Sequence, residues 1–307
     1  MSPEAERLLR PPPSTATAAV AILVTLVLAV LAASSGCARA SEELANGGAE
    51  PPQRIVTVGG AITEIVYALG AGDRVIAVDS SSVYPADAAK QPEVGYQRTL
   101  AAEGILALEP DLVLASAEAG PPATIAQLRQ AGVRVELMAP ADSVVSAADR
   151  IRAVGGVLGE RAAADALARR IEREGEALGE RVAAAPSRRR VVFVYARGGG
   201  TIMVSGGDTP AAAMIALAGG HNAIGAWTGF RPLSAEAMLA AAPDVILVPA
   251  RGLASLGGVD GLFAQPGLAG TPAGRARRVV AIDDLLLLGF GPRLPEAIAT
   301  LARELAE

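Results

Sequence analysis

Short apolar runs alternate with segments of helical spacing along the chain after residue 53. The runs are five or six residues long, and the segments between them repeat apolar residues every three or four positions. This alternation predicts an α/β fold with parallel sheets covered by helices. The predicted strands are 54–58, 74–78, 111–116, 133–138, 190–195 and 278–282, and the predicted helices are 62–69, 100–108, 121–130, 209–217 and 294–305. Residues 198–207 predict a hairpin around the apolar run 201–204.

The middle of the chain shows a different pattern, because residues 142–185 contain no strand signal. Residues 160–184 are dense in Ala, Arg, Glu and Leu, and at about 1.5 Å per residue such a helix would reach about 37 Å. Gly175 and Gly179 lie inside it and weaken its helix propensity. A helix of this length could brace two lobes. The predicted organisation is an N-terminal α/β lobe at 54–140, an interlobe helical segment at 141–187 and a C-terminal α/β lobe at 188–307.

One 13-residue segment occurs twice, at a constant offset of 133 residues. Residues 102–114 and 235–247 are identical at seven of the 13 positions, and the same offset pairs Arg98 with Arg231 upstream. A solenoid repeats every 20–50 residues or so, which is far shorter than this offset. The repeat therefore predicts two similar lobes with a cleft between them.

The N-terminal segment reads as an export signal. Residues 18–33 form an apolar run interrupted by Thr25, and Arg7 and Arg10 precede it. Sixteen residues are few for a membrane-spanning helix, which needs about 20, but they suit the apolar core of a signal peptide.

Small residues and a cysteine follow this run directly. Ser34-Ser35-Gly36-Cys37 resembles the lipobox of a bacterial lipoprotein, with Ser34 where Leu or Val is usual. We therefore interpret 1–37 as a lipoprotein leader with lipidation at Cys37, and 38–53 as a flexible tether. Ordinary cleavage after Ala40 and a retained membrane anchor are the alternatives.

Composition and missing motifs exclude several kinds of partner and site. A net charge of −5 argues against a nucleic-acid partner bound through phosphates. One Cys and one His cannot make a Cys/His zinc site, an intrachain disulfide or a bis-histidine haem site. Motifs for a nucleophile elbow, a phosphate loop and an H-E-x-x-H metal helix are missing from the sequence. We interpret His221 as a structural or surface residue, and we find no catalytic group in the sequence that would make the chain an enzyme.

The loop before the first repeat carries the candidate chemistry. Residues 95–98 (Gly-Tyr-Gln-Arg) lead into a helix, and residues 229–232 (Gly-Phe-Arg-Pro) stand at the equivalent position. Two arginines facing one cleft would suit a dianionic ligand. Tyr96, opposite Gly229, could stack, donate a hydrogen bond or ligate ferric iron as a phenolate, which Arg98 would favour. From the residues alone, a half-buried loop tyrosine with solvated arginines is the simpler interpretation.

Three segments resemble the haem (hemin) substrate-binding proteins of bacterial ABC importers: R-I-V-T-V-G-G-A-I-T-E from residue 54, G-Y-Q-R-T-L-x-x-E-G-I-L-A-L-x-P-D from residue 95 and G-F-R-P-L-S-A-E from residue 229. The same cluster includes vitamin B12 and ferric-siderophore binders, and the resemblance covers residues 54–307. It implies two Rossmann-like α/β lobes with central parallel sheets, one long joining helix, little hinge movement and a ligand cleft between the lobes.

The resemblance also implies roles for single residues. Tyr96 corresponds to the axial ligand of the haem iron, and Arg98 to its basic neighbour. Arg231 and Phe230 stand where the opposite lobe contacts haem, although tyrosine is frequent at the position of Phe230. Tyr195, at the end of a strand, is either a wall of the pocket or a core aromatic.

Glu103 and Glu236 occupy matched positions in the repeat. An acidic residue in the first helical turn is stabilising by about 0.3–1 kcal/mol, which explains a glutamate at either site. In the wider cluster, one glutamate of each lobe docks onto arginines of the permease.

The predicted function is therefore an exported haem carrier, in the periplasm or on the outer face of the cell membrane, that delivers haem to an ABC permease. Cobalamin or a ferric siderophore is the alternative cargo; an envelope enzyme and an empty-cleft structural protein are the other classes.

Overall fold

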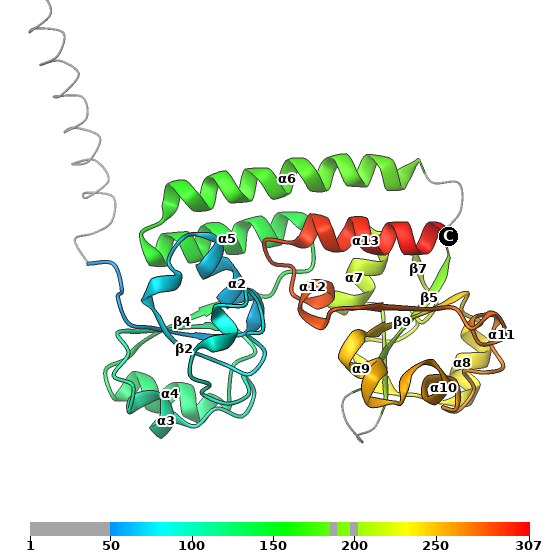
Figure 1. Ribbon diagram of the computed structural model, residues 1–307, viewed down its shortest axis with the longest axis horizontal. Coiled ribbons are helices and arrows are strands. Elements are labelled where there is room, and N and C mark those ends of the chain that lie inside the picture. Colours follow the sequence, from blue (N-terminus) through cyan, green and yellow to red (C-terminus); the bar gives the residue numbers. More distant parts are fainter. Residues whose placement is uncertain (1–49, 185–188, 197–201) are drawn as a thin grey trace, which may run out of the picture. The chain divides into compact units, whose positions relative to one another are not determined.

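The computed structural model describes residues 50–184, 189–196 and 202–307 (Figure 1). The predicted leader, Cys37 and nearly all of the predicted tether lie outside these residues. Among the helices described, none combines the length and the apolar character needed to cross a membrane. Residues 51–307 form one compact unit.

Within residues 50–184, the N-terminal lobe is built on a parallel sheet in the order β2-β1-β3-β4. All its strands were predicted from the apolar runs. They are β1 Ile55–Val58, β2 Val75–Val78, β3 Leu112–Ser116 and β4 Arg134–Met138, and the accompanying helices are α2 Gly60–Ala68, α3 Ala102–Leu106 and α4 Pro122–Gln130.

The described part of the C-terminal lobe contains a mixed sheet in the order β10-β9-β5-β6-β8, with β7 also paired to β5. β10, β9, β5 and β7 run parallel, whereas β6 is antiparallel to both β5 and β8. The strands are β5 Arg190–Tyr195, β6 Met203–Ser205, β7 His221–Asn222, β8 Phe230–Pro232, β9 Val245–Pro249 and β10 Val279–Ile282. The predicted hairpin corresponds in part to β6, but residues 197–201 lie outside the described residues.

Two sequence predictions for this lobe were wrong. Residues 229–232 were expected to form a loop, yet Phe230–Pro232 is the edge strand β8, where Val204 pairs with Arg231. An edge strand tolerates the proline because one side of it makes no ladder. Several helices of five or six residues were also missed, because so short a segment shows no helical period. The helices of this lobe are α7 Pro210–Leu217, α8 Ala235–Ala241, α9 Ala250–Ser255, α10 Gly258–Phe263, α11 Pro272–Ala276, α12 Asp284–Leu288 and α13 Leu294–Ala306.

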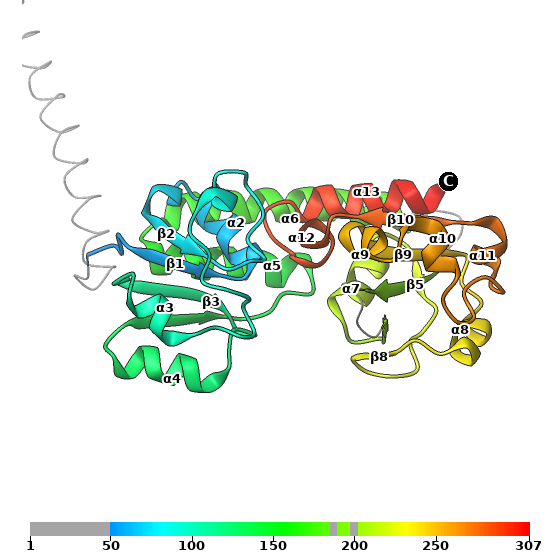
Figure 2. The ribbon, with the colours of Figure 1, turned by 60° about the horizontal axis from the view of Figure 1, so that its bottom comes forward.

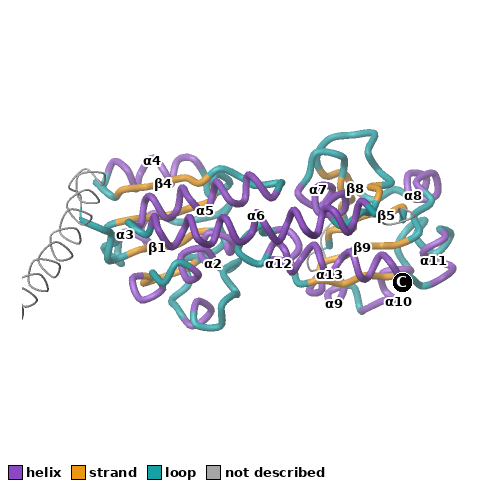
Figure 3. The backbone as a smooth tube through the Cα atoms, turned by 90° about the horizontal axis from the view of Figure 1, so that it is seen from above, coloured by secondary structure: helices purple, strands orange, loops and turns teal. Residues whose placement is uncertain are grey.

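The strand-free middle forms two helices that lie side by side, α5 Val144–Leu158 and α6 Arg161–Ala183 (Figure 1). The chain reverses at Gly159, whose φ of 78° is left-handed and favours glycine. α6 then passes along α5 and on to α13, so it packs against helices at both ends of the unit (Figures 1 and 3). The structure thus contains the predicted long joining helix.

The internal repeat is a structural repeat. α3 and α8 begin at equivalent positions, and β3 and β9 coincide along their whole length at the offset of 133. Glu109 and Ala242, also 133 apart, both take the left-handed backbone conformation, with φ of 47° and 41°. The same tight turn therefore links helix to strand in each lobe.

An arginine at the start of a strand completes this turn in both lobes. The backbone N–H of Arg54 donates to Asp111 Oδ2 at 3.1 Å, and that of Arg190 donates to Asp244 Oδ2 at 2.9 Å. Each guanidinium also donates to carbonyls at the end of the repeated helix: Arg54 to Leu108 and Glu109, and Arg190 to Ala241. This explains why the aspartate occurs in both copies.

A continuous apolar core joins the two sheets. Alternate residues of the strands, such as Ile55 and Phe193, belong to a common layer to which α2, α5, α6, α7 and α13 contribute, and the opposite residues belong to separate clusters. Figure 2 shows α6 and α13 running along the same side of both sheets. In the N-terminal lobe α3 and α4 cover that second face, and in the C-terminal lobe α8, α10 and α11 do so. The lobes therefore share one core on one side and have their own on the other.

A buried network of charges closes the shared core beside the connection from α12 to α13. Arg293 donates from Nε and a terminal nitrogen to the two oxygens of Glu64, at 3.0 and 2.9 Å. The Glu64 side chain is only 5% exposed and that of Arg293 20%. Arg150 of α5 donates to the carbonyls of Gly289 and Phe290 at 2.6 and 2.7 Å, and burial lowers its pKa to about 10. These bonds link α2 and α5 to the C-terminal lobe.

The crossing of α5 and α6 generates the first prediction. A Cβ on Gly155 would lie 2.2 Å from Ala164 Cβ, whereas a Cβ on Gly179 would meet nothing within 4 Å. We expect Gly155→Ala to lower the free energy of unfolding by about 1–3 kcal/mol through overpacking. The matched change Gly179→Ala should raise it by up to about 1 kcal/mol, because alanine favours helix. Urea denaturation of both variants measures this, and equal effects would contradict the close packing.

The buried ion pair between Glu64 and Arg293 generates the second prediction. Glu64→Gln leaves the Arg293 guanidinium buried without its counter-charge, and removing one partner of a buried pair costs about 3–5 kcal/mol. The control is Glu136→Gln, which removes the carboxylate from an exposed pair with Arg134 and should cost about 1 kcal/mol or less. Urea denaturation gives both values. A loss for Glu64→Gln as small as that of the control would show that the pair does not join the lobes.

Candidate functional site

A cavity of about 410 Å³ opens where the carboxyl ends of the two sheets face each other. Loops after β1, β2, β3 and β4 line it from the N-terminal lobe, and the end of β5 and the segments after β9 and β10 line it from the C-terminal lobe. Carboxyl ends of parallel strands are where α/β proteins bind ligands. The lining residues used below are Gly59, Gly60, Ser80, Ser81, Tyr96, Gln97, Ser116, Glu118, Arg150, Tyr195, Arg251, Asp283, Asp284, Leu285 and Leu288.

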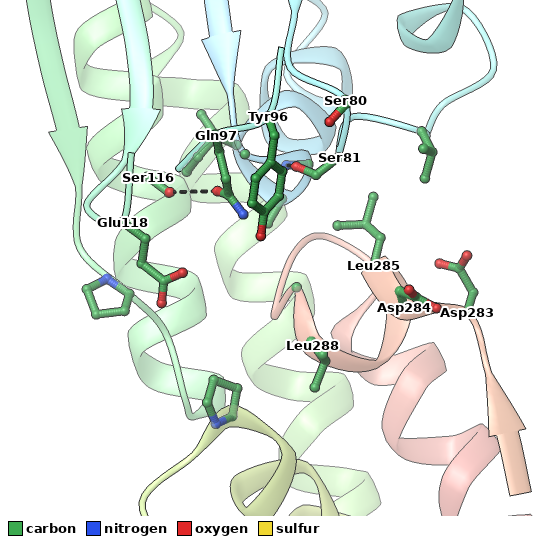
Figure 4. A pocket seen from close by; sticks show the side chains of 18 of the residues that line it. Ser80, Ser81, Tyr96, Gln97, Ser116, Glu118, Asp283, Asp284, Leu285 and Leu288 are labelled. Atoms are coloured by element: carbon green, nitrogen blue, oxygen red, sulfur yellow. Dashed lines mark hydrogen bonds between the residues drawn. The ribbon is translucent and has the colours of Figure 1, made fainter. Parts of the chain in front are cut away.

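Tyr96 lies on the N-terminal wall of this cavity. Figure 4 shows its ring extending from the loop, with the hydroxyl directed into the space between Glu118 and the leucines of α12. Gly95, with a φ of 94°, turns the chain just before it. Its carbonyl accepts from Ser80 N at 2.9 Å, and the Tyr96 carbonyl accepts from Thr99 N at 2.8 Å. These bonds hold a half-buried tyrosine at the surface of the cavity.

A buried aspartate organises the same wall. Asp79 accepts hydrogen bonds from Gly59 N at 2.8 Å, from Ser81 N and Oγ at 3.0 and 2.7 Å, and from Ser82 Oγ at 2.8 Å. Ser81 Oγ in turn accepts from Gly60 N at 3.0 Å. The loops after β1 and β2 are therefore joined through one carboxylate.

Arg98 lies at the rim and not among the residues that line the cavity. Its guanidinium forms an ion pair with Glu118, which does line the cavity. Beside this pair, Ser116 Oγ donates to Gln97 Oε1 at 3.1 Å (Figure 4). The loop before α3 and the turn after β3 thus meet at the edge of the cleft.

The C-terminal wall combines an aromatic ring, apolar side chains and charges. Tyr195 ends β5, lines the cavity and also packs against the shared core, so it combines its two predicted roles. Leu285 and Leu288 of α12 supply apolar surface (Figure 4). Burial raises the pKa of Asp284 above its ordinary value, and the Arg251 backbone and charge oppose that rise.

Phe230 and Arg231 lie in β8, outside the residues that line the cavity. The Phe230 ring is 6.1 Å from that of Tyr195 and 6.3 Å from that of Phe193, measured between centroids. The guanidinium of Arg231 lies 5.2 Å from the centre of the Trp227 ring. Arg98 and Arg231, the paired arginines of the repeat, therefore do not face each other across the cleft in this structure. Arg98 pairs with the carboxylate of Glu118, and Arg231 lies over the indole ring of Trp227.

The remaining predicted residues lie away from the cavity. Glu103 and Glu236 are exposed in the first turns of α3 and α8. His221 is exposed in β7 and pairs with Arg190, at the amino end of β5. The cavity is reached at the other end of that strand, about 16 Å away at 3.3 Å per residue. His221 therefore lies far from Tyr96's cavity, as its assignment to the surface predicted.

Several cavity residues were not singled out from the sequence. Ser80 and Ser81 follow one predicted strand after Asp79, and Asp283 and Asp284 directly follow another. Polar pairs at the carboxyl ends of strands were a signal that could have identified them. Arg150 had no such signal, because it sits inside a helix and reaches the cavity only through the packing of α5. Among the described residues, no group of three or more His, Cys, Asp or Glu side chains is placed to hold a metal ion.

Comparison with known proteins identifies the family. The family model described as periplasmic binding protein matches residues 55–286. The periplasmic heme-binding protein RhuT from Roseiflexus sp. RS-1, in its apo form, superposes with a TM-score of 0.81 at 46% identity, over 83% of this chain and 98% of that chain. The periplasmic heme-binding protein BhuT in complex with two hemes gives 0.78 at 47% identity, over 82% and 97%.

Two relatives found by sequence support the same family. The uncharacterized ABC transporter substrate-binding lipoprotein YvrC of Bacillus subtilis (strain 168) is 29% identical over 83% of this chain and 80% of its own length. The vitamin B12-binding protein of Vibrio cholerae is 40% identical over a shorter stretch of 85 residues, 28% of this chain and 31% of that protein. These family members and structural neighbours are binding proteins and not enzymes. The chain belongs to the periplasmic binding protein family.

Proposed function

We propose that this chain is the extracytoplasmic haem-binding component of an ABC importer. It holds haem in the cleft between its lobes, with Tyr96 as the axial ligand of the iron, and delivers the haem to a permease. The observation that carries the proposal is the phenol of Tyr96 directed into a cavity lined by both lobes, in a chain nearly half identical to two periplasmic haem-binding proteins.

The chemistry of the cavity suits this cargo. A phenolate oxygen is an established axial ligand of haem iron, and Tyr96 is anchored in a short hydrogen-bonded loop. Leu285 and Leu288 offer apolar surface to a porphyrin face. Arg98, two residues from Tyr96, supplies positive charge at the rim, where haem carboxylates would reach solvent.

The C-terminal lobe contributes aromatic surface in this proposal. Tyr195 faces the cavity and Phe230 packs beside it, so together they offer an aromatic edge to a flat macrocycle. Arg231 remains a proposed haem contact: its guanidinium lies on an exposed edge strand, from which a long side chain can turn toward the cleft.

Cobalamin is the second candidate cargo, because an 85-residue stretch is 40% identical to a vitamin B12-binding protein. Cobalamin and ferric siderophores need no phenolate from the protein. The placement of Tyr96 therefore favours haem over both.

Docking to the permease is proposed for Glu103 and Glu236. Both are exposed, and each begins the same repeated helix in its own lobe, so together they offer two equivalent carboxylates to one membrane partner. Lipidation at Cys37, which lies outside the described residues, would anchor the protein to a membrane, either on the outer face of the cell membrane or facing the periplasm.

A hemin titration tests the iron ligand. The wild-type chain should give a ferric high-spin, tyrosinate-type absorption spectrum. Tyr96→Phe removes only the hydroxyl, and should abolish that spectrum and weaken binding on the order of 100-fold, since even outer partners of a metal ligand contribute 10–100-fold. Tyr67→Phe, a tyrosine of α2 outside the cavity lining, is the control and should bind as the wild type does.

Two results would contradict this assignment. Loss of the tyrosinate spectrum in Tyr195→Phe, with Tyr96→Phe unaffected, would move the ligand to the other lobe. If the wild-type protein does not bind hemin but binds cyanocobalamin, the cargo is cobalamin and not haem.

Charge reversal tests the docking surface. In the bacterium that carries this chain, Glu103→Lys combined with Glu236→Lys should abolish haem-supported growth under iron limitation, because like charges would then face the permease. The purified double variant should still bind hemin within about two-fold of wild type, since exposed charges far from the ligand contribute little. Glu176→Lys, on the exposed face of α6, is the control. Normal growth of the double variant would exclude the docking role.

A further inference from the structure

The positive charge of Arg98 is already matched by a residue of the cleft wall. Arg98 forms an ion pair with Glu118, and the two side chains are 58% and 53% exposed. Glu118 lines the cavity, whereas Arg98 is not among the residues that line it. Figure 4 shows Glu118 beside Ser116 on the wall from which the Tyr96 ring also extends. A ligand entering the cleft therefore meets the carboxylate of Glu118 as well as the arginine.

The backbone keeps these two residues together. Gly120 N donates to the Gln97 carbonyl at 2.8 Å, and Leu100 N donates to the Gly120 carbonyl at 2.9 Å. Ser116 Oγ adds a bond to the Gln97 side chain at 3.1 Å. The loop before α3 and the turn after β3 are thus joined on both sides of the pair. Glu118 can leave Arg98 by rotation of its side chain, and it returns to the same partner when it rotates back.

The other charges of the cavity do not replace this pair. Arg150 is bonded to two backbone carbonyls. Arg251 lies on the C-terminal wall with two acidic neighbours, Asp283 and Asp284. On the described part of the N-terminal wall, Glu118 is the carboxylate that lines the cavity and Arg98 is the cation beside it. A carboxylate of the cargo that approaches this wall must therefore compete with Glu118.

We propose that Glu118 occupies on Arg98 the place that a carboxylate of the cargo takes on binding, so that it acts as an internal competitor and sets the affinity for carboxylate-bearing ligands. The inference rests on the proposed function and extends it to specificity. Exchange of one carboxylate for another on a guanidinium conserves the charge-assisted hydrogen bonds. An exposed ion pair contributes little stability, so the exchange is easy in both directions. A cargo whose carboxylates are blocked cannot take part in this exchange, so its affinity should not depend on Glu118.

The test compares two ligands and two variants of the full-length chain. The ligands are hemin and hemin dimethyl ester, whose propionates are esterified. Glu118→Gln keeps the shape of the side chain and removes its charge. Glu136→Gln is the matched control, because Glu136 pairs with Arg134 on β4 of the same lobe, outside the cavity lining. We expect Glu118→Gln to bind hemin about three- to ten-fold more tightly than wild type, since both the competition and the repulsion of like charges are removed.

The same variant should bind the dimethyl ester as wild type does, and the control should leave both affinities unchanged. Three results would overturn the proposal for Glu118 while the proposed function stands: unchanged hemin affinity, weaker hemin binding, or an equal gain for hemin and its ester, which would mean that Glu118 acts through Tyr96. A wild-type protein that binds neither ligand would overturn the proposed function, and the role of Glu118 with it.

Discussion

The apolar core shared by both sheets is the constraint on which the cleft depends. α5, α6 and α13 bury one face of each sheet in a single layer, and close-packed interiors do not deform continuously. The ion pair between Glu64 and Arg293 seals this layer beside the cavity. Opening the lobes would expose core side chains and separate buried charges, both of which are costly. The two walls of the cleft are therefore held in place before a ligand arrives.

Duplication explains how the walls come to face each other, and divergence explains what they carry. Both lobes repeat the helix, the left-handed turn and the arginine–aspartate bond that position β3 and β9. Each sheet thus presents its carboxyl end to the same cavity. The copies differ just upstream: one has the loop with Tyr96, and the other has the edge strand β8. The proposed iron ligand therefore comes from one lobe, and aromatic surface from the other.

The sequence predicted those parts of the fold that depend on local pattern. The strands from β1 to β5 are continuous apolar runs, and α6 and α13 are long enough to show a helical period. β8 and the short helices α9 to α12 were missed because pairing and packing stabilise them, not their own periodicity. In the site, the loop position made Tyr96 a candidate, and the family resemblance gave it the role of iron ligand. The pairing of Arg98 with Glu118, 20 residues away, depends on how two turns meet, which no local pattern encodes.

A cleft with fixed walls sets a particular problem for the proposed carrier function, because a carrier must release its cargo. Tight binding by preformed walls slows dissociation, and the shared core resists release by wide opening of the lobes. Side chains at the rim are then the parts that can exchange partners at low cost. The exposed pair of Arg98 and Glu118 has this property, because its two members stay adjacent whether or not they are bonded. An internal carboxylate that reclaims the arginine shortens the residence of the cargo without any change in the scaffold, so rigidity of the fold and reversibility of binding are compatible in one molecule.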